Sequence, residues 1–477
     1  MANPPPKTID VLREEFRAHG QSHVFDFWDQ LDDAGRAALH AQTSRLAPLL
    51  TDLVAAQGRA IASLAEPAAC DIEPADAIVL PEYGGDPGRF EAARRIGLEV
   101  LAAGRVGVLV VAGGQATRLG RDDPKGGFPI GPVTDRSLFA LQAQKIRGLA
   151  RRLGGPVPWY VMTSPATDWA TRALFERNRY FDLDPEDVFI FSQSMVPACD
   201  FDGRFMLETA SRVFENPNGH GGALTALLAS GALDDMARRG IDRLFCYQVD
   251  NPLVRIADPV YVGFHEETGA QMSCKVARKT DPMQKVGVVA RSRGRPTIVE
   301  YTELSDAHRR MRDDSGDLVF WAGNVAIHLF DTDFVRRIAT HANQLLPYHA
   351  SVKEIPSVDA SGRPIDVAKP NGYKLERFVF DALPAAEHIC VLEVRADEEF
   401  APIKNAVGTD SPETARRALV AQYRGWLLKA GIEVPRDAEW IEINHAHIDG
   451  ADEAATCGFE ALADAGDVIQ VAMGMDS

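Results

Sequence analysis

The six cysteines of this 477-residue chain are few and scattered, at positions 70, 199, 246, 274, 390 and 457, and no two form a C-x-x-C pair. This spacing argues against a zinc knuckle and against a redox-active dithiol. The sequence also has no apolar stretch of about 18 residues, and its first residues, MANPPPKTIDVLREEF, lack the apolar core of a signal peptide. We therefore expect a reduced, cytoplasmic protein with no membrane partner. Cys246, inside the apolar run LFCYQV, is predicted to pack in the core.

Basic residues are fewer than acidic residues. The chain has 68 acidic and 51 basic residues, which gives a net charge of −17, and it contains no lysine-rich tail or basic run. Nucleic acid is therefore not an expected partner. An acidic protein that binds anions must concentrate its cations locally, because its overall field repels such ligands. Basic residues beside glycine turns consequently carry more information here than they would in a basic protein.

Alternating strand and helix patterns indicate the fold. The predicted strands cover residues 106–112, 158–163, 187–192, 243–249, 271–278 and 286–291, and the predicted helices cover 137–152, 167–178, 222–239 and 258–267. This alternation predicts a doubly wound, Rossmann-like α/β fold whose mixed sheet is mostly parallel and has helices on both faces. Residues 286–301 are expected to add a hairpin to this sheet.

The ends of the chain have different patterns. Residues 8–65 show apolar residues at helical spacing, and residues 66–90, rich in Pro, Ala, Gly and Asp, are predicted to be a linker or a wrapping arm. Residues 412–430 are expected to be helical and to precede a small strand-containing cap from residue 437 onward. We therefore predict three domains: a helical segment with its linker (1–85), a central α/β domain (86–405) and a small C-terminal domain (406–477).

The most informative stretch is VGVLVVAGGQATRLGRDDPKGGFPI, residues 106–130. Five apolar residues, Val108 to Ala112, run without alternation, as in a parallel strand covered on both faces. Gly113 and Gly114 follow directly, where a ligand can approach bare backbone. Arg118 and Lys125 then add positive charge. This combination is typical of a polyphosphate site at the carboxyl end of a parallel strand.

The sequence of this stretch does not match the consensus of two known phosphate-binding loops. A Walker loop requires Ser or Thr after its lysine, whereas Lys125 is followed by Gly126. The dinucleotide fingerprint G-x-G-x-x-G is also absent from this turn. The alternative for a glycine pair alone is an ordinary strand-to-helix turn with solvated side chains. The additional Arg118, Pro124 and Lys125 favour the phosphate site.

The same stretch resembles the UTP-dependent sugar-1-phosphate uridylyltransferases, and most closely the eukaryotic-type UDP-N-acetylhexosamine pyrophosphorylases. The shared string is A-G-G-Q-x-T-R-L-G, here residues 112–120, followed by P-K-G at 124–126. Ala116 stands where the family has glycine, so the backbone there must tolerate a Cβ. The resemblance implies a nucleotidyltransferase fold and in-line attack of a sugar phosphate on the α-phosphate of UTP, with pyrophosphate leaving. Such a reaction needs aligned substrates, cations and a carboxylate for Mg²⁺, without a covalent nucleophile.

A second motif supplies the carboxylate. Asp250 ends the apolar stretch LFCYQV, and ligands of open α/β sheets bind at carboxyl ends of strands. Mg²⁺ is usually held by one or two carboxylates together with phosphate oxygens. The alternative is an Asp that caps the following turn. The family has V-D-N-x-L-V-x-x-A-D-P, matched here by residues 249–259, and this resemblance implies that Asp250 contacts the nucleotide and Mg²⁺.

The loop PNGHGG, residues 217–222, precedes an apolar helix and can present backbone amides to a ligand. The alternative is a plain surface loop. The N-acetylhexosamine enzymes place Asn where this chain has His220, whereas glucose-1-phosphate and broad-specificity enzymes place His there. Gln193, in FSQSMVP, resembles the family glutamine that reads uracil, and a carboxamide matches the alternating donor and acceptor edge of that base.

The remaining motifs concern the sugar and its phosphate. Gly287, Glu300, Tyr301 and Asn324 stand in segments that resemble the family's sugar-binding segments, although each residue alone would more often be structural. Lys374, in NGYKLERFVFD, and Lys404, in EFAPIKNA, match two family lysines. A lysine is a mobile point charge that can follow a phosphate. The order and surroundings of both lysines favour a functional role over a solvated surface position.

The sequence therefore predicts a Mg²⁺-dependent uridylyltransferase that uses UTP and a hexose-1-phosphate. N-acetylglucosamine-1-phosphate is the preferred sugar, with glucose-1-phosphate or a broader range as the rival because of His220. A non-catalytic nucleotide-sugar sensor and a metal hydrolase are the alternatives from other classes, and the chain is expected to be a monomer or homodimer. The predicted catalytic residues are Arg118, Lys125 and Lys404; the nucleotide-binding residues are Val111, Ala112, Gly113, Gly114, Lys125, Gln193, Gly219, Asp250 and Lys374; the sugar-binding residues are His220, Gly287, Glu300, Tyr301, Asn324 and Lys404; and the metal ligand is Asp250.

Overall fold

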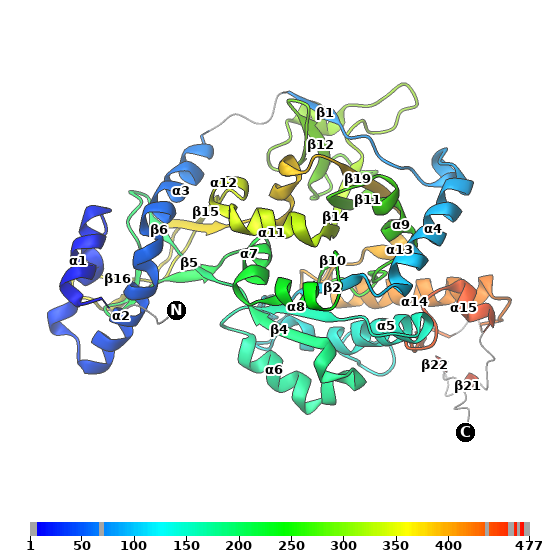
Figure 1. Cartoon of the computed structure of the whole chain (residues 1–477), viewed down its shortest axis with the longest axis horizontal. Coiled ribbons are helices and arrows are strands. Elements are labelled where there is room, and N and C mark those ends of the chain that lie inside the picture. Colours follow the sequence, from blue (N-terminus) through cyan, green and yellow to red (C-terminus); the bar gives the residue numbers. More distant parts are fainter. Residues whose placement is uncertain (1–6, 66–70, 435–437, 457–461, 465–467, 472–477) are drawn as a thin grey trace. The chain divides into compact units, whose positions relative to one another are not determined.

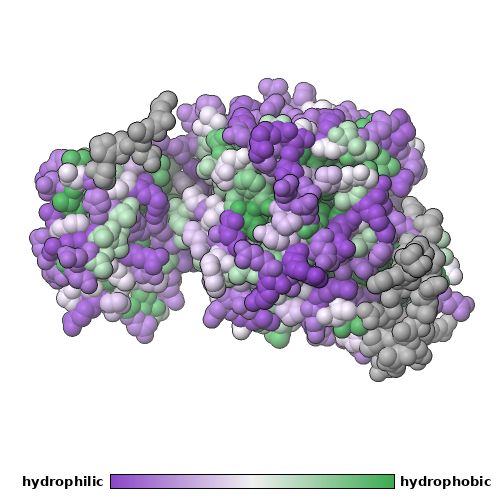
Figure 2. All heavy atoms as spheres, turned by 60° about the horizontal axis from the view of Figure 1, so that its bottom comes forward, coloured by the Kyte–Doolittle hydropathy of each residue, from purple (hydrophilic) through white to green (hydrophobic). Residues whose placement is uncertain are grey.

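The computed structural model describes residues 7–65, 71–434, 438–456, 462–464 and 468–471. The chain forms two compact units. Unit 1 comprises Met1–Pro67, Gln193–Thr225 and His341–Ala382, and unit 2 comprises Ala68–Ser192, Ala226–Thr340 and Leu383–Ser477. The division into residues 1–85, 86–405 and 406–477 stays a prediction. Hydrophilic residues cover most of the face drawn in Figure 2, as expected of a chain with 25% charged residues.

Unit 2 is built on a ten-stranded mixed sheet (Figure 1). Its strands are β1 (Ile72–Pro74), β2 (Val106–Val111), β3 (Trp159–Thr163), β4 (Val188–Ser192), β10 (Arg243–Gln248), β11 (Met272–Arg278), β12 (Val288–Ser292), β13 (Arg295–Val299), β14 (Ala322–Asp331) and β19 (Ile389–Val394). The main path is β1-β12-β14-β10-β2-β3-β4, with β13 on β12, β11 on β14 and β19 on β11. The hairpin predicted for residues 286–301 is the antiparallel pair β12 and β13.

The centre of this sheet is parallel. Strands β10, β2, β3 and β4 run in the same direction, while β14 is antiparallel to β10. All six residues of β2 are buried, which explains its continuous apolar run. Gln248 pairs with Val111, so β10 and β2 end side by side. The mostly parallel mixed sheet predicted from the sequence is confirmed, and residues that follow these two strands meet at one edge.

Helices α4 (Pro87–Ala102), α5 (Leu138–Leu153) and α9 (Pro259–Glu267) pack in one hydrophobic cluster with the strands. This cluster joins Ala93 of α4, Phe139 of α5 and Phe264 of α9 to Val108 and Phe245 of the sheet. The other helices that lie wholly in unit 2 are α6 (Asp168–Arg177), α8 (Ala232–Arg238), α10 (Asp306–Arg310), α11 (Thr332–Thr340), α13 (Ala396–Glu399), α14 (Pro412–Lys429) and α15 (Ala451–Thr456). No helix within the described ranges is both long and apolar enough to cross a membrane.

One local expectation is corrected, and a second is made more specific. The single helix expected over 222–239 is two helices, α7 (Gly222–Ala229) and α8, because Gly231 adopts a left-handed backbone with φ of +79°. The segment 66–90, expected to be a linker or a wrapping arm, includes ordered structure, because β1 pairs with β12 and α4 begins at Pro87. Cys246 is buried in β10, as predicted, and Cys70 and Cys457 lie outside the described residues.

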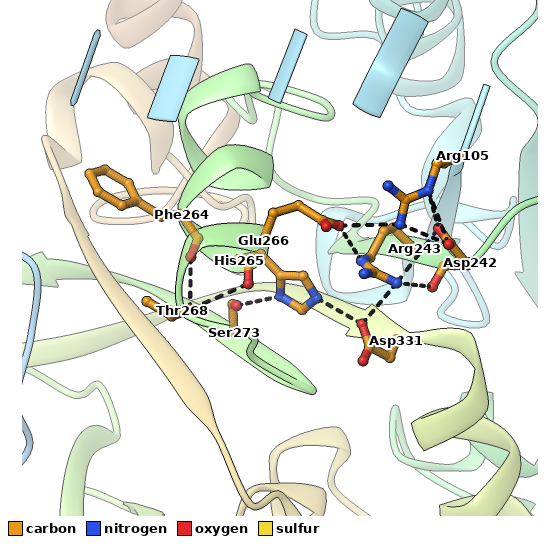
Figure 3. Close-up of polar contacts among 9 residues, drawn as sticks. All are labelled: Arg105, Asp242, Arg243, Phe264, His265, Glu266, Thr268, Ser273 and Asp331. Atoms are coloured by element: carbon orange, nitrogen blue, oxygen red, sulfur yellow. Dashed lines mark hydrogen bonds and ion pairs between the residues drawn. The ribbon is translucent and has the colours of Figure 1, made fainter. Parts of the chain in front are cut away.

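The amino ends of β2 and β10 carry a network of charged side chains (Figure 3). Arg105 binds Asp242 through two nitrogens, and Arg243 contacts both Glu266 (2.5 Å) and Asp331 (3.2 Å). His265 lies between Ser273 and Asp331 in the same network. These charges neutralise one another at the end of the strands opposite to Gly113 and Asp250. They therefore stabilise the sheet rather than form part of the predicted site.

The C-terminal cap packs against α5. Leu419 and Tyr423 of α14 share a core with Ile441, Ile443 and Leu138. Strand β20 (Trp440–Ile443) pairs in parallel with β22 (Val468–Val471), which pairs with β21 (Leu462–Asp464). The predicted helix over 412–430 and the strand-containing cap beyond residue 437 are therefore present.

Unit 1 combines helices with short strands. Its helices are α1 (Ile9–Ala18), α2 (Asp33–Leu46), α3 (Leu50–Ser63) and α12 (Ala342–Leu345), and its strands are β5 (Met195–Pro197), β6 (Cys199–Asp200), β7 (Leu207–Thr209), β8 (Arg212–Val213), β9 (Glu215–Pro217), β15 (His349–Lys353), β16 (Ser357–Val358), β17 (Pro364–Ile365) and β18 (Gly372–Glu376). Phe16 and Leu39 of the helices share a core with Phe205, Leu207 and Val213. The predicted helical segment thus packs against strands that lie far away in sequence.

Candidate active site

The loop after β2 folds back on itself. The Ala116 N–H donates to the Asp123 carbonyl (3.0 Å), and the Lys125 N–H donates to the Gly114 carbonyl (3.1 Å). These two bonds bring Lys125 next to the glycine turn, although it lies ten positions after Gln115. Open space surrounds the position that a Cβ of Gly114 would occupy, so a ligand can reach the backbone there.

Lys125 and Asp250 meet at the edge where β2 and β10 end. The Lys125 Nζ lies 3.0 Å from the Asp250 Oδ2, and the two side chains are 18% and 16% exposed. The pairing follows from the register of the sheet, because β2 and β10 are adjacent and parallel and end at the same level. A cation and a carboxylate, 125 residues apart in sequence, thus share one partly open position.

The structure explains the departure at Ala116. This residue has φ of −87°, a conformation that L-residues adopt readily, and its methyl group is buried. The loop consequently accepts alanine where the family has glycine. Arg118, on the short helical turn Thr117–Leu119, is exposed. It lies in the same loop as Lys125.

The predicted sugar residues of unit 2 form a second group. A Cβ on Gly287 would lie 3.0 Å from the Glu300 Oε1 and 2.9 Å from the Ile298 side chain, so only glycine lets Glu300 approach this closely. The Asn324 N–H donates to the Gly287 carbonyl (2.8 Å). The Asn324 Oδ1 accepts the Ala326 N–H (3.1 Å), which leaves its Nδ2 as the group available to donate. Tyr301 follows Glu300 and is exposed, with its carbonyl bound to Arg309.

Unit 1 brings Gln193, Gly219 and His220 together. Gly219 has φ of +71°, and a Cβ there would lie 2.5 Å from the Arg377 carbonyl, so two independent constraints require glycine. Gln193 is buried, and its Oε1 lies 3.0 Å from the position that a Cβ of Gly222 would occupy. The glycine loop after β9 is therefore fixed between Gln193 and Arg377.

Lys374 lies two residues before Glu376, whose Cβ is 3.0 Å from the position that a Cβ of Gly219 would occupy. It stands on β18, and its Nζ lies 4.9 Å from the centre of the Phe214 ring. Burial lowers the pKa of its ammonium group, which Glu376 partly offsets. The structure thus places the Lys374 amino group over an aromatic ring.

The His220 ring is oriented by residues 378–380. The Val379 N–H donates to the His220 Nδ1 (3.1 Å), so the ring proton is on Nε2, which can only donate. The ring stacks on Phe378 with centroids 5.2 Å apart and contacts Phe380. Phe378 also stacks on His349, whose Nε2 lies 2.8 Å from Asp381. His220 therefore offers a fixed donor, whereas the family's asparagine offers both a donor and an acceptor.

This environment predicts a pH effect on stability. Burial, together with the charge of His349, lowers the pKa of His220 from 6.5 to about 4. Because the folded pKa is the lower one, the neutral ring stabilises the fold fully above pH 6.5 and loses this contribution as the pH falls toward 4. We expect wild type to lose about 2.5 kcal/mol more unfolding free energy between about pH 7 and pH 4.5 than His220→Asn does. Urea unfolding of both proteins at the two pH values measures this difference, and equal losses would contradict it.

Asp250 is suited to a divalent cation that also binds phosphate. Its Oδ2 accepts from Lys125, and no described residue donates to its Oδ1. Mg²⁺ typically takes one or two carboxylates and completes its shell with water and phosphate oxygens. Within the described ranges, no three His, Cys, Asp or Glu side chains gather as an all-protein cage. A single, partly exposed carboxylate fits a Mg²⁺ site that water and phosphate oxygens complete.

Several residues of this region had no individual signal in the sequence. The Ser164 Oγ donates to the Gly113 carbonyl (2.7 Å) and fixes the turn from β3. Gly126 lies directly against the Phe139 ring, so a side chain there would collide with the core. Asn251 binds three backbone groups beyond the strand end. Gly126 and Asn251 could have been singled out, because each stands in a matched motif.

The fold and the paired cation and carboxylate define a nucleotidyltransferase of the α/β class. The sequence profile of UTP–glucose-1-phosphate uridylyltransferases matches residues 94–436, and the chain belongs to this family. The resemblance inferred from the glycine loop is thereby confirmed.

Curated relatives and solved structures agree with this assignment. The chain is 38% identical over 439 residues to UDP-N-acetylhexosamine pyrophosphorylase-like protein 1 of Homo sapiens (88% of this chain, 85% of that protein). It is 34% identical to UDP-N-acetylglucosamine pyrophosphorylase of Saccharomyces cerevisiae (91% and 94%). The inhibitor-bound crystal structure of uridine diphosphate N-acetylglucosamine pyrophosphorylase from Trypanosoma brucei has a TM-score of 0.82 at 28% identity (98% and 99% covered). A UDP-glucose pyrophosphorylase of Leishmania major shares the fold, with a TM-score of 0.60 at 17% identity (86% of this chain and 79% of that chain covered).

Proposed function

We propose that this chain is a uridylyltransferase that forms UDP-N-acetylglucosamine and pyrophosphate from UTP and N-acetylglucosamine-1-phosphate. The observation that carries the proposal is the 3.0 Å contact between Lys125 and Asp250 beside an open glycine turn. Uridylyl transfer needs aligned phosphates and neutralised charge, and a cation and a carboxylate at this edge meet both needs. The relatives named above support the N-acetylglucosamine branch.

The residues of unit 2 take the phosphates in this proposal. The backbone of Val111 to Gly114 holds the nucleotide, Arg118 and Lys125 neutralise the triphosphate, and Lys404 binds the sugar phosphate. Asp250 holds Mg²⁺, which, when bound, neutralises phosphate charge and orients the α-phosphate. The sugar phosphate oxygen attacks the α-phosphorus, and the bond to the bridging oxygen of pyrophosphate breaks.

Base and sugar recognition use polar side chains. Gln193 pairs with the uracil edge, and Gly219 presents its backbone beside it. Lys374 adds charge for the phosphates. In unit 2, Asn324 donates to the sugar, Glu300 accepts from its hydroxyls, Gly287 leaves room for the C2 substituent, and Tyr301 also takes part in sugar binding. In unit 1, His220 donates to the sugar. A cytoplasmic location and a monomer or homodimer remain predictions.

Glucose-1-phosphate is the second candidate substrate, because His220 replaces the asparagine of the N-acetylhexosamine branch and offers only a donor. Pyrophosphate release with UTP and a panel of sugar-1-phosphates tests both candidates. We expect a higher kcat/KM with N-acetylglucosamine-1-phosphate, and a large preference for glucose-1-phosphate would overturn the choice of sugar. Nucleotide-sugar binding without turnover for any sugar would support the sensor instead.

A further inference from the structure

A fully buried cation joins three segments of unit 2. Lys275, on β11, is 0% exposed, and its Nζ donates to Asp258 (3.0 Å) and to both carboxylate oxygens of Glu399 (2.6 Å each). Asp258 caps the start of α9, and Glu399 ends α13. A buried charge must keep its partners, because an unpaired ion in the interior is costly. The segments before α9 and after α13 are therefore held together from within the core.

Asn251 adds a second link between the same two segments. Its side chain is almost completely buried, at 3% exposure of the residue. The Nδ2 donates to the Glu399 carbonyl (2.7 Å), while the Oδ1 accepts the N–H groups of Ala401 (3.1 Å) and Leu253 (3.3 Å). One buried amide thus satisfies three backbone groups that would otherwise lack partners.

The two segments that Asn251 links also carry Asp250 and Lys404. Asp250 immediately precedes Asn251, and its carbonyl accepts the Ile403 N–H (3.0 Å). Lys404 is the next residue, and its own N–H donates to the Asp410 carbonyl (2.7 Å). The backbone of Lys404 is therefore fixed on one side by the Asp250–Asn251 turn and on the other by the turn that leads into α14.

We propose that Asn251 and the buried Lys275–Glu399 pair are positioning residues that fix the backbone of Lys404 relative to Asp250. They touch no substrate. They act by holding the cation for the sugar phosphate and the carboxylate for the metal at a constant separation while the phosphates move. The inference rests on the proposed function, because it assigns these roles to Lys404 and Asp250.

A double-mutant cycle with Asn251→Ala and Lys404→Ala tests this role. We expect Asn251→Ala to lower kcat/KM for the sugar-1-phosphate about tenfold, with a much smaller change in the KM for UTP. In the Lys404→Ala background the same substitution is expected to have little further effect, because the group that it positions is already absent. Losses that multiply in the double variant would overturn the inference.

The matched control is Gln142→Ala. Gln142 is also a buried amide, and its Nε2 donates to the Val249 carbonyl (2.9 Å), one residue before Asp250. Its described side-chain contacts do not reach residues 399–404. We expect this variant to lose stability in urea without a change in the sugar-phosphate KM of the folded enzyme. Equal kinetic changes in Gln142→Ala and Asn251→Ala would also overturn the inference.

A second variant covers the case in which Asn251→Ala does not fold. Glu399→Gln keeps the shape of the side chain and an oxygen for Lys275, and it enters the same cycle with Lys404→Ala. Failure of the proposed function is separate and visible, because wild type would then form no UDP-sugar from any sugar in the panel, and the inference would fall with it. If wild type forms UDP-sugar but the losses in kcat/KM multiply in the double variant, only the positioning role is overturned.

Discussion

Replacing Lys125 with alanine is expected to lower kcat by about 10²- to 10³-fold, the usual effect of removing one group that stabilises transition-state charge. Its ammonium is held beside the glycine turn by the loop's own backbone bonds and lies 3.0 Å from Asp250. Negative charge builds up on pyrophosphate as it leaves, and a fixed cation lowers the energy of that state more than that of the bound substrates. Steady-state pyrophosphate release at saturating UTP and sugar phosphate measures the loss.

Arg121→Ala is the control for this substitution. Arg121 belongs to the same loop, is exposed and pairs with Asp123. Its removal eliminates a positive charge without touching the Lys125–Asp250 contact, so activity is expected to stay within about threefold of wild type, the range of a surface ion pair. Both variants should unfold in urea near the wild-type midpoint, because both side chains reach solvent. A Lys125→Ala enzyme with nearly full activity would show that another cation does this work.

The parts of the fold that local patterns determine were predictable. Strands β2, β3, β4 and β10 lie within one or two residues of the predicted ranges, because each is a short apolar run bounded by turn residues. The loop at 112–126 was identified for the same reason, since all of its information is contiguous. The contact between Lys125 and Asp250 depends on two further features: adjacent parallel strands bring their carboxyl ends to one edge, and backbone bonds fold the loop back so that Lys125 reaches that edge.

Non-local pairing explains what the sequence did not predict. Strand β14 was not expected, although it lies in the middle of the sheet, because its burial comes from β10 and β11 rather than from its own pattern. Strand β19 pairs with β11 and with a single bridge at Ile78, and β1 pairs with β12, so their partners lie far away in sequence. Unit 1 is assembled from three stretches separated by more than a hundred residues, and no periodicity carries that information.

The buried contacts of Lys275 and Glu399 behind the site also could not be predicted from local sequence patterns. Lys275 on β11 looked like an ordinary strand residue, and its partner Glu399 lies 124 positions away. Buried ion pairs of this kind are defined by the fold, because each charge is tolerated only where the other is already placed. His220 shows the reverse case. The sequence indicated its relevance to the sugar, but only the Val379 contact defines which ring nitrogen can donate.

Replacing Asp250 with asparagine is expected to have an effect as large as the loss of Lys125. Asparagine keeps the shape of the side chain, its oxygen can still accept from Lys125, and the backbone bond from Ile403 is unaffected. What disappears is the negative charge that a hard divalent cation requires. We expect kcat/KM to fall about 10²- to 10³-fold and the Mg²⁺ concentration for half-maximal activity to rise at least about tenfold.

Asp242→Asn is the matched control, because Asp242 lies directly before the amino end of β10 and pairs with Arg105 in the network of Figure 3. It should lower the unfolding free energy by about 1 kcal/mol, with no change in the Mg²⁺ requirement. Titrating activity with Mg²⁺ for the three proteins separates the outcomes. If Asp250→Asn reaches the wild-type rate at the same Mg²⁺ concentration, the cation binds elsewhere, and Asp250 serves only to orient Lys125.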